Sequence, residues 1–289
     1  MTAPDRDDHS GVETTGHEWD GVKELNNPLP RWWLWTFYAS VAWSVVYWIL
    51  MPAWPGISGY TKGVRNHSER ANVEAAIGAL DAARGGAMQQ LLAVNSIADV
   101  EKDPALLQYG MAAGASLFGD NCATCHGAGG QGFSGYPNLN DDSWLWGGRF
   151  EDIRQTIRYG IRSGHEKARF NMMQAYGRDG LLPAETISDL TDYVLHLSGK
   201  AADEAAVRRA APIFAQQCAS CHGAEGKGDQ RQGAPNLADA IGLYGIDRAT
   251  IAETLRNGRG GVMPAWEGRL SEEQIVALAV YVHSLGGGE

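Results

Sequence analysis

Two nearly identical segments of twelve residues occur in this chain, and the two copies contain all of its cysteines. NCATCHGAGGQG begins at Asn121 and QCASCHGAEGKG begins at Gln217. Both contain Cys-x-x-Cys-His, the pattern typical of covalent attachment of a c-type haem. The chain must therefore fold so that each copy brings two cysteines and one histidine to one ligand. These residues are Cys122, Cys125 and His126 in the first copy, and Cys218, Cys221 and His222 in the second.

Two other uses of paired cysteines fit these residues less well. One zinc ion could join all four thiolates, but such a site gives no role to the histidine that follows each pair. A redox dithiol of the thioredoxin type is expected near a βαβ pattern, and none surrounds either copy. Two covalently bound haem c groups, one for each copy, use all six residues.

The similarity between the two regions extends well beyond the cysteines. YPNLN at Tyr136 corresponds to APNLA at Ala234, and the helical segment IRQTIRYGIR corresponds to IAETLRNGRG. Each region closes with an amphipathic helical pattern, and neither shows a convincing strand pattern. Domains of this size have small cores, which a buried porphyrin would enlarge. We therefore predict an all-α chain with two tandem cytochrome c domains, at residues 105–199 and 203–286.

Methionine is the expected second axial ligand of each iron, because Met/His ligation is typical of cytochromes c. Met263, in the segment VMPAW, is the only methionine after Cys218. In the first repeat Met172 and Met173 compete, and alignment on Met263 favours Met173, although Gln174 replaces the proline of the second repeat. The expected iron ligands are His126 and Met173 (alternatively Met172) for haem 1, and His222 and Met263 for haem 2.

Two filled axial positions leave neither iron open to a substrate. Histidine could replace methionine at one iron, and His165, in a loop flanked by glycine, is the candidate for that role. The sequence shows no Ser-His-Asp set, P-loop or paired-carboxylate pattern. A net charge of −10 without any basic run argues against a nucleic-acid partner. We expect an electron carrier with no catalytic site of its own.

A long uncharged stretch precedes both repeats. Between Arg31 and Lys62 there is no charged residue, and WWLWTFYASVAWSVVYWILMPAW is long enough to cross a bilayer as a helix. Trp and Tyr lie at both of its ends, as in aromatic belts at membrane interfaces. A cleavable signal peptide would begin nearer the N-terminus, with a basic head and a small-residue cleavage site. We predict an uncleaved transmembrane helix at residues 31–54, after a polar, weakly ordered tail at residues 1–30.

Two further segments allow more than one role. Residues 55–104 form a linker in which the stretch from Glu69 to Asn95 has helical spacing, as one amphipathic helix or a helix pair bent at Gly85 and Gly86. This helix could dock on a partner or serve as a packing strut. Trp144 and Trp146 in DDSWLWGG lack a counterpart in the second repeat; they are expected in an insert that packs on the first domain or docks it on a partner.

The full layout resembles a known family. The segment DGVKELNNPLPRWWLWTFYASVAWSVVYWILMPAWP from Asp20, followed by the two haem motifs, is similar to subunit III, of the CcoP or FixP type, of cbb3-type cytochrome c oxidases. The resemblance implies a bacterial inner-membrane complex with a haem–copper catalytic subunit and a monohaem c subunit. This chain would take electrons from a donor cytochrome c and pass them inward. Oxygen reduction and proton pumping would belong to the catalytic subunit.

The resemblance also implies an orientation. Haem is attached to cytochromes c on the periplasmic side, so the tail would lie in the cytoplasm and residues after about 60 in the periplasm. Two rival functions remain: a dihaem subunit of a periplasmic dehydrogenase and a dihaem peroxidase. Dehydrogenase subunits usually carry three haem sites, and a peroxidase needs one iron with a position that can open.

Overall fold

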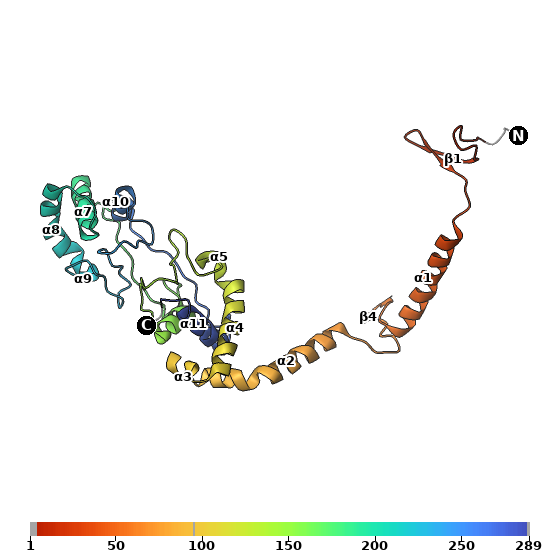
Figure 1. Cartoon of the computed structure of the whole chain (residues 1–289), viewed down its shortest axis with the longest axis horizontal. Coiled ribbons are helices and arrows are strands. Elements are labelled where there is room, and N and C mark those ends of the chain that lie inside the picture. The colour runs from red at the N-terminus through yellow and green to blue at the C-terminus, as the bar shows by residue number, and fades with distance from the viewer. Residues whose placement is uncertain (1–4, 95, 288–289) are drawn as a thin grey trace. The chain divides into compact units, whose positions relative to one another are not determined.

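The computed structural model describes residues 5–94 and 96–287, and the chain divides into two compact units between Asp81 and Ala82. Figure 1 labels most of the elements of the two units. The first unit contains an N-terminal hairpin and one long apolar helix. The second unit contains both Cys-x-x-Cys-His motifs. Its helices are α3 (Ile97–Glu101), α4 (Pro104–Asn121), α5 (Ala123–His126), α6 (Phe150–Tyr159), α7 (Ala184–Leu197), α8 (Glu204–Gln217), α9 (Ala219–His222), α10 (Arg248–Asn257) and α11 (Glu272–His283).

The N-terminal tail is more ordered than expected. Strands β1 (Thr14–Trp19) and β2 (Val22–Leu25) pair antiparallel, with Trp19 opposite Val22. Asp20 and Gly21 form the connection and both have positive φ, 48° and 85°. Asp-Gly favours this turn, which matches the twist of a two-stranded ribbon. The Asp-Gly pair between Trp19 and Val22 was the sequence signal for the hairpin.

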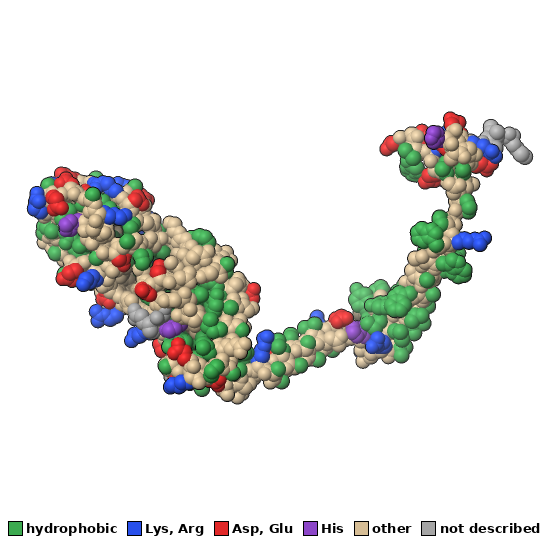
Figure 2. All heavy atoms as spheres, viewed as in Figure 1, with side chains coloured by type: hydrophobic (Ala, Val, Ile, Leu, Met, Phe, Trp, Pro, Cys, Tyr) green, Lys and Arg blue, Asp and Glu red, His purple; other side chains and the backbone are tan. Residues whose placement is uncertain are grey.

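Helix α1 (Arg31–Leu50) is the predicted membrane span and ends four residues earlier than expected. Among the residues that the structure describes, it is the one helix long and apolar enough to cross a membrane. Its side chains are largely exposed, and hydrophobic groups cover its surface in Figure 2. The hydroxyls of Thr36, Ser40 and Ser44 donate to carbonyls within the helix, so they need no water. A short ribbon of β3 (Pro55–Gly56) and β4 (Gly59–Tyr60) follows.

The linker contains one continuous helix rather than a bent pair. Helix α2 (Glu69–Leu92) runs through Gly85 and Gly86, and the boundary between the two units falls within it. Val73 and Ile77 near its start are more than half exposed, whereas Leu91 near its end is fully buried in the core of the second unit. The C-terminal end of α2 is therefore a packing element.

The two closing helices of the repeats are exchanged. Helix α7 closes the first repeat, yet it packs on α8 and α10 of the second repeat; α11 closes the second repeat and packs on α4 and α6 of the first. We define module 1 as α4, α5, α6 and α11, and module 2 as α8, α9, α10 and α7. The expected domains at 105–199 and 203–286 therefore match the sequence repeats but not the packing. Both closing helices have a similar apolar pattern, so periodicity alone does not select the partner.

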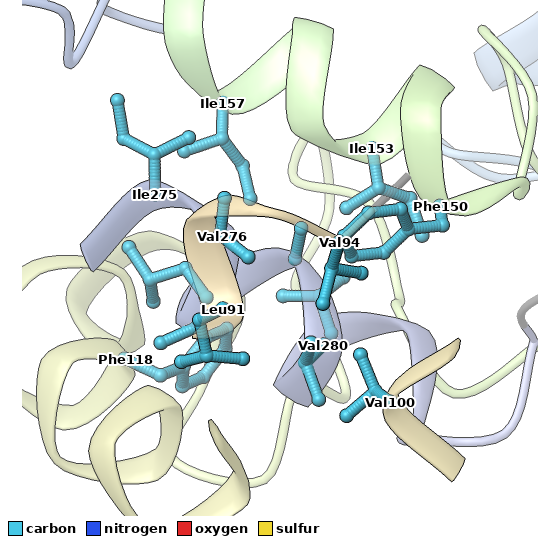
Figure 3. Packing of buried hydrophobic residues seen from close by; sticks show 14 of the residues in the cluster. Leu91, Val94, Val100, Phe118, Phe150, Ile153, Ile157, Ile275, Val276 and Val280 are labelled. Atoms are coloured by element: carbon cyan, nitrogen blue, oxygen red, sulfur yellow. The ribbon is translucent and has the colours of Figure 1, made fainter. Parts of the chain in front are cut away.

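The core of module 1 shows the exchange directly. In Figure 3, Ile275, Val276 and Val280 of α11 lie among Phe118 of α4 and Ile153 of α6, all of them buried. The matching core of module 2 places Ile187 and Leu190 of α7 against side chains of α8 and α10. Burial of apolar surface on this scale holds each exchanged helix in place. The buried partners in module 2 include Ala210, Phe214, Ile251 and Leu255.

Helices α4 and α11 approach closely at Gly114, and this contact yields a prediction. A Cβ at Gly114 would clash with the carbonyl oxygen of Ala277 and the Cβ of Tyr281. Gly114→Ala should therefore lower the unfolding free energy of module 1 by about 1–3 kcal/mol, the usual cost of overpacking. Gly119→Ala in the same helix is the control, because nothing lies within 4 Å of its added Cβ. Denaturant unfolding of both variants that gave equal midpoints would contradict the close contact.

Ion pairs join each exchanged helix to the other repeat. In module 2, Arg209 of α8 donates two hydrogen bonds to Asp189 at 2.8 and 2.7 Å, and Arg248 of α10 donates to Asp192 at 2.5 Å. In module 1, Glu272 of α11 accepts hydrogen bonds from Arg154 and Arg158 of α6. The two sets of pairs are equivalent in effect, because each fixes a closing helix of one repeat to a helix of the other.

The acidic pairs of α7 predict a pH dependence. The guanidinium of Arg209 lowers the pKa of Asp189, and that of Arg248 lowers the pKa of Asp192, both from 3.8. A carboxyl with a lowered folded-state pKa stabilises the fold above its ordinary pKa, and this contribution disappears as the pH falls through the lowered value. Module 2 should therefore lose stability below about pH 4.

Asp192→Asn is the matched variant for this test. It should lower the unfolding free energy at neutral pH by about 1 kcal/mol and should reduce the loss on acidification. Unfolding midpoints measured between neutral pH and pH 3 for both proteins check this. Identical pH profiles would contradict a role for the Asp192 pair.

Candidate haem-binding sites

Both Cys-x-x-Cys-His motifs begin where a helix ends. Cys122 directly follows α4 and its amide donates to the carbonyl of Phe118; Cys218 follows α8 and donates to Phe214. The short helices α5 and α9 then carry the second cysteine and the histidine of each motif. The next residues, Gly127 and Gly223, have φ of 80° and 77°, a conformation that glycine adopts without strain. The two motifs thus have the same local geometry.

The motif histidines are set up as neutral ligands. The Nδ1 of His126 lies 3.0 Å from the carbonyl oxygen of Pro137, and the Nδ1 of His222 lies 3.0 Å from that of Pro235. A carbonyl only accepts, so each Nδ1 carries the hydrogen and each Nε2 keeps its lone pair. Burial lowers the pKa of both imidazoles, which favours the neutral form. A carbonyl that accepts a hydrogen bond from the ring nitrogen not bound to metal orients a metal-binding histidine in this way.

The four thiols do not suit the rival cysteine chemistries. Burial raises the pKa of Cys122 and of Cys218 to about 11, whereas a reactive dithiol needs a lowered thiol pKa. Within residues 5–94 and 96–287, no three His, Cys, Asp or Glu side chains converge to hold a metal ion. The two Cys pairs therefore do not form one four-thiolate zinc site.

Met173 lies with the second motif. It lines one cavity together with Cys218, Cys221 and His222, whose walls also include apolar side chains of α7, α8 and α10. The backbone of Met173 exchanges two hydrogen bonds with Arg259, at 2.9 and 3.1 Å. Arg259 follows α10 by two residues, so this pairing fixes Met173 beside module 2. A cleft with two thiols, one neutral imidazole and one thioether matches the donor set of a covalently bound haem c.

Met263 lies with the first motif by the same geometry. It packs against the module 1 core, as Cys122 and Ala123 of the first motif also do. Its backbone exchanges two hydrogen bonds of 3.0 Å with Ile161, which follows α6 by two residues. A Cβ at Gly160 would clash with the carbonyl oxygen of Met263, so glycine permits this crossing. Gly258 has the same relation to Met173.

This arrangement differs from the pairing expected within each repeat. The sequence paired Met173 with His126 and Met263 with His222, whereas the packing brings Met173 to His222 and Met263 to the module of His126. The chain crosses from module 1 to module 2 before Met173 and returns before Met263. Each methionine therefore lies after a crossing, in the module of the other repeat. The aligned repeats are equally consistent with ligand pairs within one repeat and with ligand pairs between the repeats. Sequence alignment could therefore not reveal the crossing.

The other candidate ligands lie in different surroundings. The side chain of Met172 is about half exposed at the rim of the module 2 cavity, whereas Met173 is half-buried within it. The ring of His165 stacks on Tyr159, and its Nε2 lies 2.9 Å from a carboxylate oxygen of Glu267. His165 therefore contacts Tyr159 and Glu267 and is not among the residues that line the module 2 cavity.

Trp146 does have a counterpart, contrary to expectation. Leu145-Trp146-Gly147 aligns with Leu243-Tyr244-Gly245 at constant spacing, a correspondence that comparison of the intervening residues could have found. Trp146 is buried against Gly233 of the second repeat, and Tyr244 lies against Gly135 of the first. The indole of Trp144 donates to the carbonyl of Gly287. Both tryptophans are thus engaged inside the second unit rather than offered to an external partner.

The apolar span, the two Cys-x-x-Cys-His motifs with the same local geometry and the Met/His cavity of module 2 define a membrane-anchored dihaem c-type cytochrome. Three family models match the chain: the N-terminal domain of cytochrome oxidase-cbb3, FixP, at residues 11–58; cytochrome c at residues 111–198; and cytochrome c oxidase, cbb3-type, subunit III, at residues 205–282. The chain belongs to the FixP/CcoP family of cbb3-type cytochrome c oxidase subunits, and it carries two covalently bound haem c groups.

Curated relatives cover nearly the full chain. A cbb3-type cytochrome c oxidase subunit FixP of Bradyrhizobium sp. (strain ORS 278) is 54% identical over 98% of each chain. A subunit CcoP of Cereibacter sphaeroides is 52% identical over 96% of this chain and 95% of its own length. A subunit CcoP of Azospirillum brasilense is 46% identical over the whole of both chains.

Proposed function

We propose that this chain is the electron-transfer subunit of a cbb3-type oxidase. It takes electrons from a donor cytochrome c and passes them, through a monohaem c subunit, towards a haem–copper oxygen-reducing subunit. Bound haem iron supplies reversible one-electron chemistry. The module 2 cavity, in which a neutral imidazole lies with a thioether and two thiols, carries the proposal, because this ligand set leaves no position for a substrate. The chain has no catalytic site of its own in this function.

The proposed ligand pairs follow the modules rather than the repeats. Cys122 and Cys125 hold haem 1, and Cys218 and Cys221 hold haem 2. His126 and Met263 would hold the iron of haem 1, and His222 and Met173 would hold that of haem 2. The hydrogen bonds from each histidine Nδ1 to a proline carbonyl keep the imidazole in the tautomer that can bind iron. The half-buried position of Met173 favours it over the exposed Met172.

The proposed location is the bacterial inner membrane. Helix α1 spans the bilayer once, with the N-terminal hairpin in the cytoplasm and both haem modules in the periplasm. Positive charges near the two ends of α1 are nearly balanced, Lys23 and Arg31 before it and Lys62 and Arg65 after it. The orientation therefore rests on the attachment of haem c on the periplasmic side.

Purification of the full-length chain in mild detergent tests this function. A pyridine haemochrome assay should count two covalent haems, and copper and a further haem-containing subunit should copurify. A reduced cytochrome c should then reduce both haems in the complex under anaerobic conditions. Turnover of hydrogen peroxide by the chain without other subunits would instead support the peroxidase alternative. Copurification with a dehydrogenase, and without copper, would support the alternative that the chain is a dihaem subunit of a periplasmic dehydrogenase.

A further inference from the structure

Two arginines line the module 2 cavity without a carboxylate partner. Arg162 follows α6 of the first repeat and Arg259 follows α10 of the second, and both are half-buried. Neither forms an ion pair within the part of the chain that the structure describes. Burying a charge without a counter-ion is costly, so a pair of such guanidinium groups calls for an anion. Carboxylates do pair with the other arginines that join the helices, namely Arg154, Arg158, Arg169, Arg209 and Arg248.

Arg259 is held in place by neutral groups. Its guanidinium carbon lies 4.2 Å from the centroid of the Tyr244 ring, and its Nε donates to the hydroxyl of Thr254 at 3.0 Å. Its two terminal amino groups make no hydrogen bond to any described residue. Both Tyr244 and Thr254 also line the cavity. Arg259 is therefore oriented by uncharged contacts and keeps its strongest donors free.

Arg162 is placed in the same cavity by backbone contacts. Its Nε donates to the carbonyl of Gly261 at 2.6 Å, and one terminal amino group donates to the carbonyl of Asn171. These carbonyls belong to the two segments in which the chain crosses between the modules. Its φ of 51° lies in the left-handed region, which non-glycine residues adopt at a cost. Burial lowers the pKa of this guanidinium, but arginine stays charged at neutral pH.

We propose that Arg162 and Arg259 bind the propionates of haem 2 and hold its reduction potential above that of haem 1. The inference rests on the proposed function, which puts a haem c in this cavity. A haem c carries two propionates on the edge opposite the vinyl groups, and Cys218 and Cys221 take up the vinyl edge. Among the described residues, Asp239 is the one carboxylate that lines the cavity, and it already accepts a hydrogen bond from the amide of Ile241.

The direction of the effect follows from charge. Reduction removes one positive charge from the iron centre, so a nearby cation favours the reduced form and raises the potential. Paired guanidinium groups also neutralise propionates, which would otherwise favour the oxidised form. Loss of either arginine should therefore lower the potential of haem 2.

Module 1 lacks the same charges. At the position of Arg259, next to the methionine of the other repeat, module 1 has Ile161. Trp146 takes the position of Tyr244, and the arginine over its ring, Arg169, is paired with Asp152 at 3.1 Å. This arginine therefore has a carboxylate partner in the protein, which Arg149 also contacts at 2.9 Å. The difference in unpaired charge makes haem 2 the haem of higher potential.

Voltammetry of the full-length chain with both haems attached tests the proposal. The wave of haem 2 is the one that persists in the double variant Cys122→Ala, Cys125→Ala, an assignment that does not depend on the methionine pairing. It should be the higher wave. Arg259→Gln should shift the oxidised-to-reduced ratio of haem 2 about tenfold at fixed potential, about 59 mV downward for one electron, and leave haem 1 unchanged. Arg162→Gln should act in the same direction, and Arg162→Lys should restore part of the shift.

A spectroscopic readout and a control separate this role from a structural one. Resonance Raman bands of the propionate bending mode should shift in Arg259→Gln, while the sulfur-to-iron charge-transfer band of methionine-ligated ferric haem should remain. Arg256→Gln is the control, because Arg256 lies in α10, three residues before Arg259, is exposed and pairs with Glu253. It should move neither wave.

The proposal is overturned if Arg259→Gln keeps the methionine band and leaves the potential of haem 2 within the range of the control. It is also overturned if both waves fall equally. If Arg162→Gln loses the methionine band, its iron has lost a ligand and its potential no longer reports on the propionates. Arg259→Gln alone then tests the proposal. Failure of the proposed function would be visible earlier, as a missing haem or a missing methionine band in the unsubstituted chain.

Discussion

Met173→Ala is expected to remove the sixth ligand from the haem held by Cys218 and Cys221, and to leave the other haem six-coordinate. Met173 lines the cavity of His222 and is fixed there by two backbone hydrogen bonds to Arg259. The open haem should become high-spin and bind carbon monoxide. Its potential should fall steeply, because a methionine ligand raises the potential of a c-type haem. Pairing within the repeat predicts the same loss at the haem of the first motif.

A background with one haem separates the two pairings. The double variant Cys122→Ala, Cys125→Ala carries only the second haem, which should keep the sulfur-to-iron charge-transfer band of the oxidised form. In that background Met173→Ala should abolish the band, and Met263→Ala should leave it. The opposite result would restore the ligand pairing expected from the sequence. Met172→Ala, at the exposed neighbour of Met173, is the matched control and should also leave the band intact.

Core substitutions in the closing helices should act on the module of the opposite repeat. Leu278 of α11 is fully buried in the core of module 1, and Leu190 of α7 is 1% exposed in the core of module 2. Truncation of a buried leucine to alanine costs about 2–5 kcal/mol. Leu278→Ala should therefore destabilise the surroundings of haem 1, although Leu278 follows the second haem motif in sequence. Leu190→Ala should destabilise those of haem 2.

Each variant serves as the control for the other. Haem loss is prevented by the thioethers, so the readout is carbon monoxide binding to each haem during denaturant titration, assigned with the one-haem variant. Leu190→Ala should shift the midpoint for haem 2 to lower denaturant and change that of haem 1 much less. Equal shifts of both midpoints would indicate that the modules unfold as one unit. A shift confined to haem 1 would contradict the exchange of the closing helices.

The sequence alone determined the chemistry of this protein. Cys-x-x-Cys-His fixes which side chains hold each haem, because the two thiols and the imidazole are neighbours in the chain and one helical turn sets their geometry. The apolar stretch from Arg31 identified the membrane span, because a bilayer requires a long uncharged helix. These features depend on local order along the chain, and each remained readable without knowledge of the fold.

Only the tertiary structure placed Met173 in the cavity of His222 and Met263 on the core of module 1. His126 and its methionine are far apart in sequence, and either repeat could supply the missing ligand and the closing helix. The choice depends on the crossings at Gly160 and Gly258, where the backbone pairs with Met263 and Met173. Helices α7 and α11 occupy equivalent positions at the ends of the two repeats, so their place in the sequence does not tell which module each one closes. A ligand pair formed across such a distance is fixed by packing and chain path, which a repeated sequence does not specify.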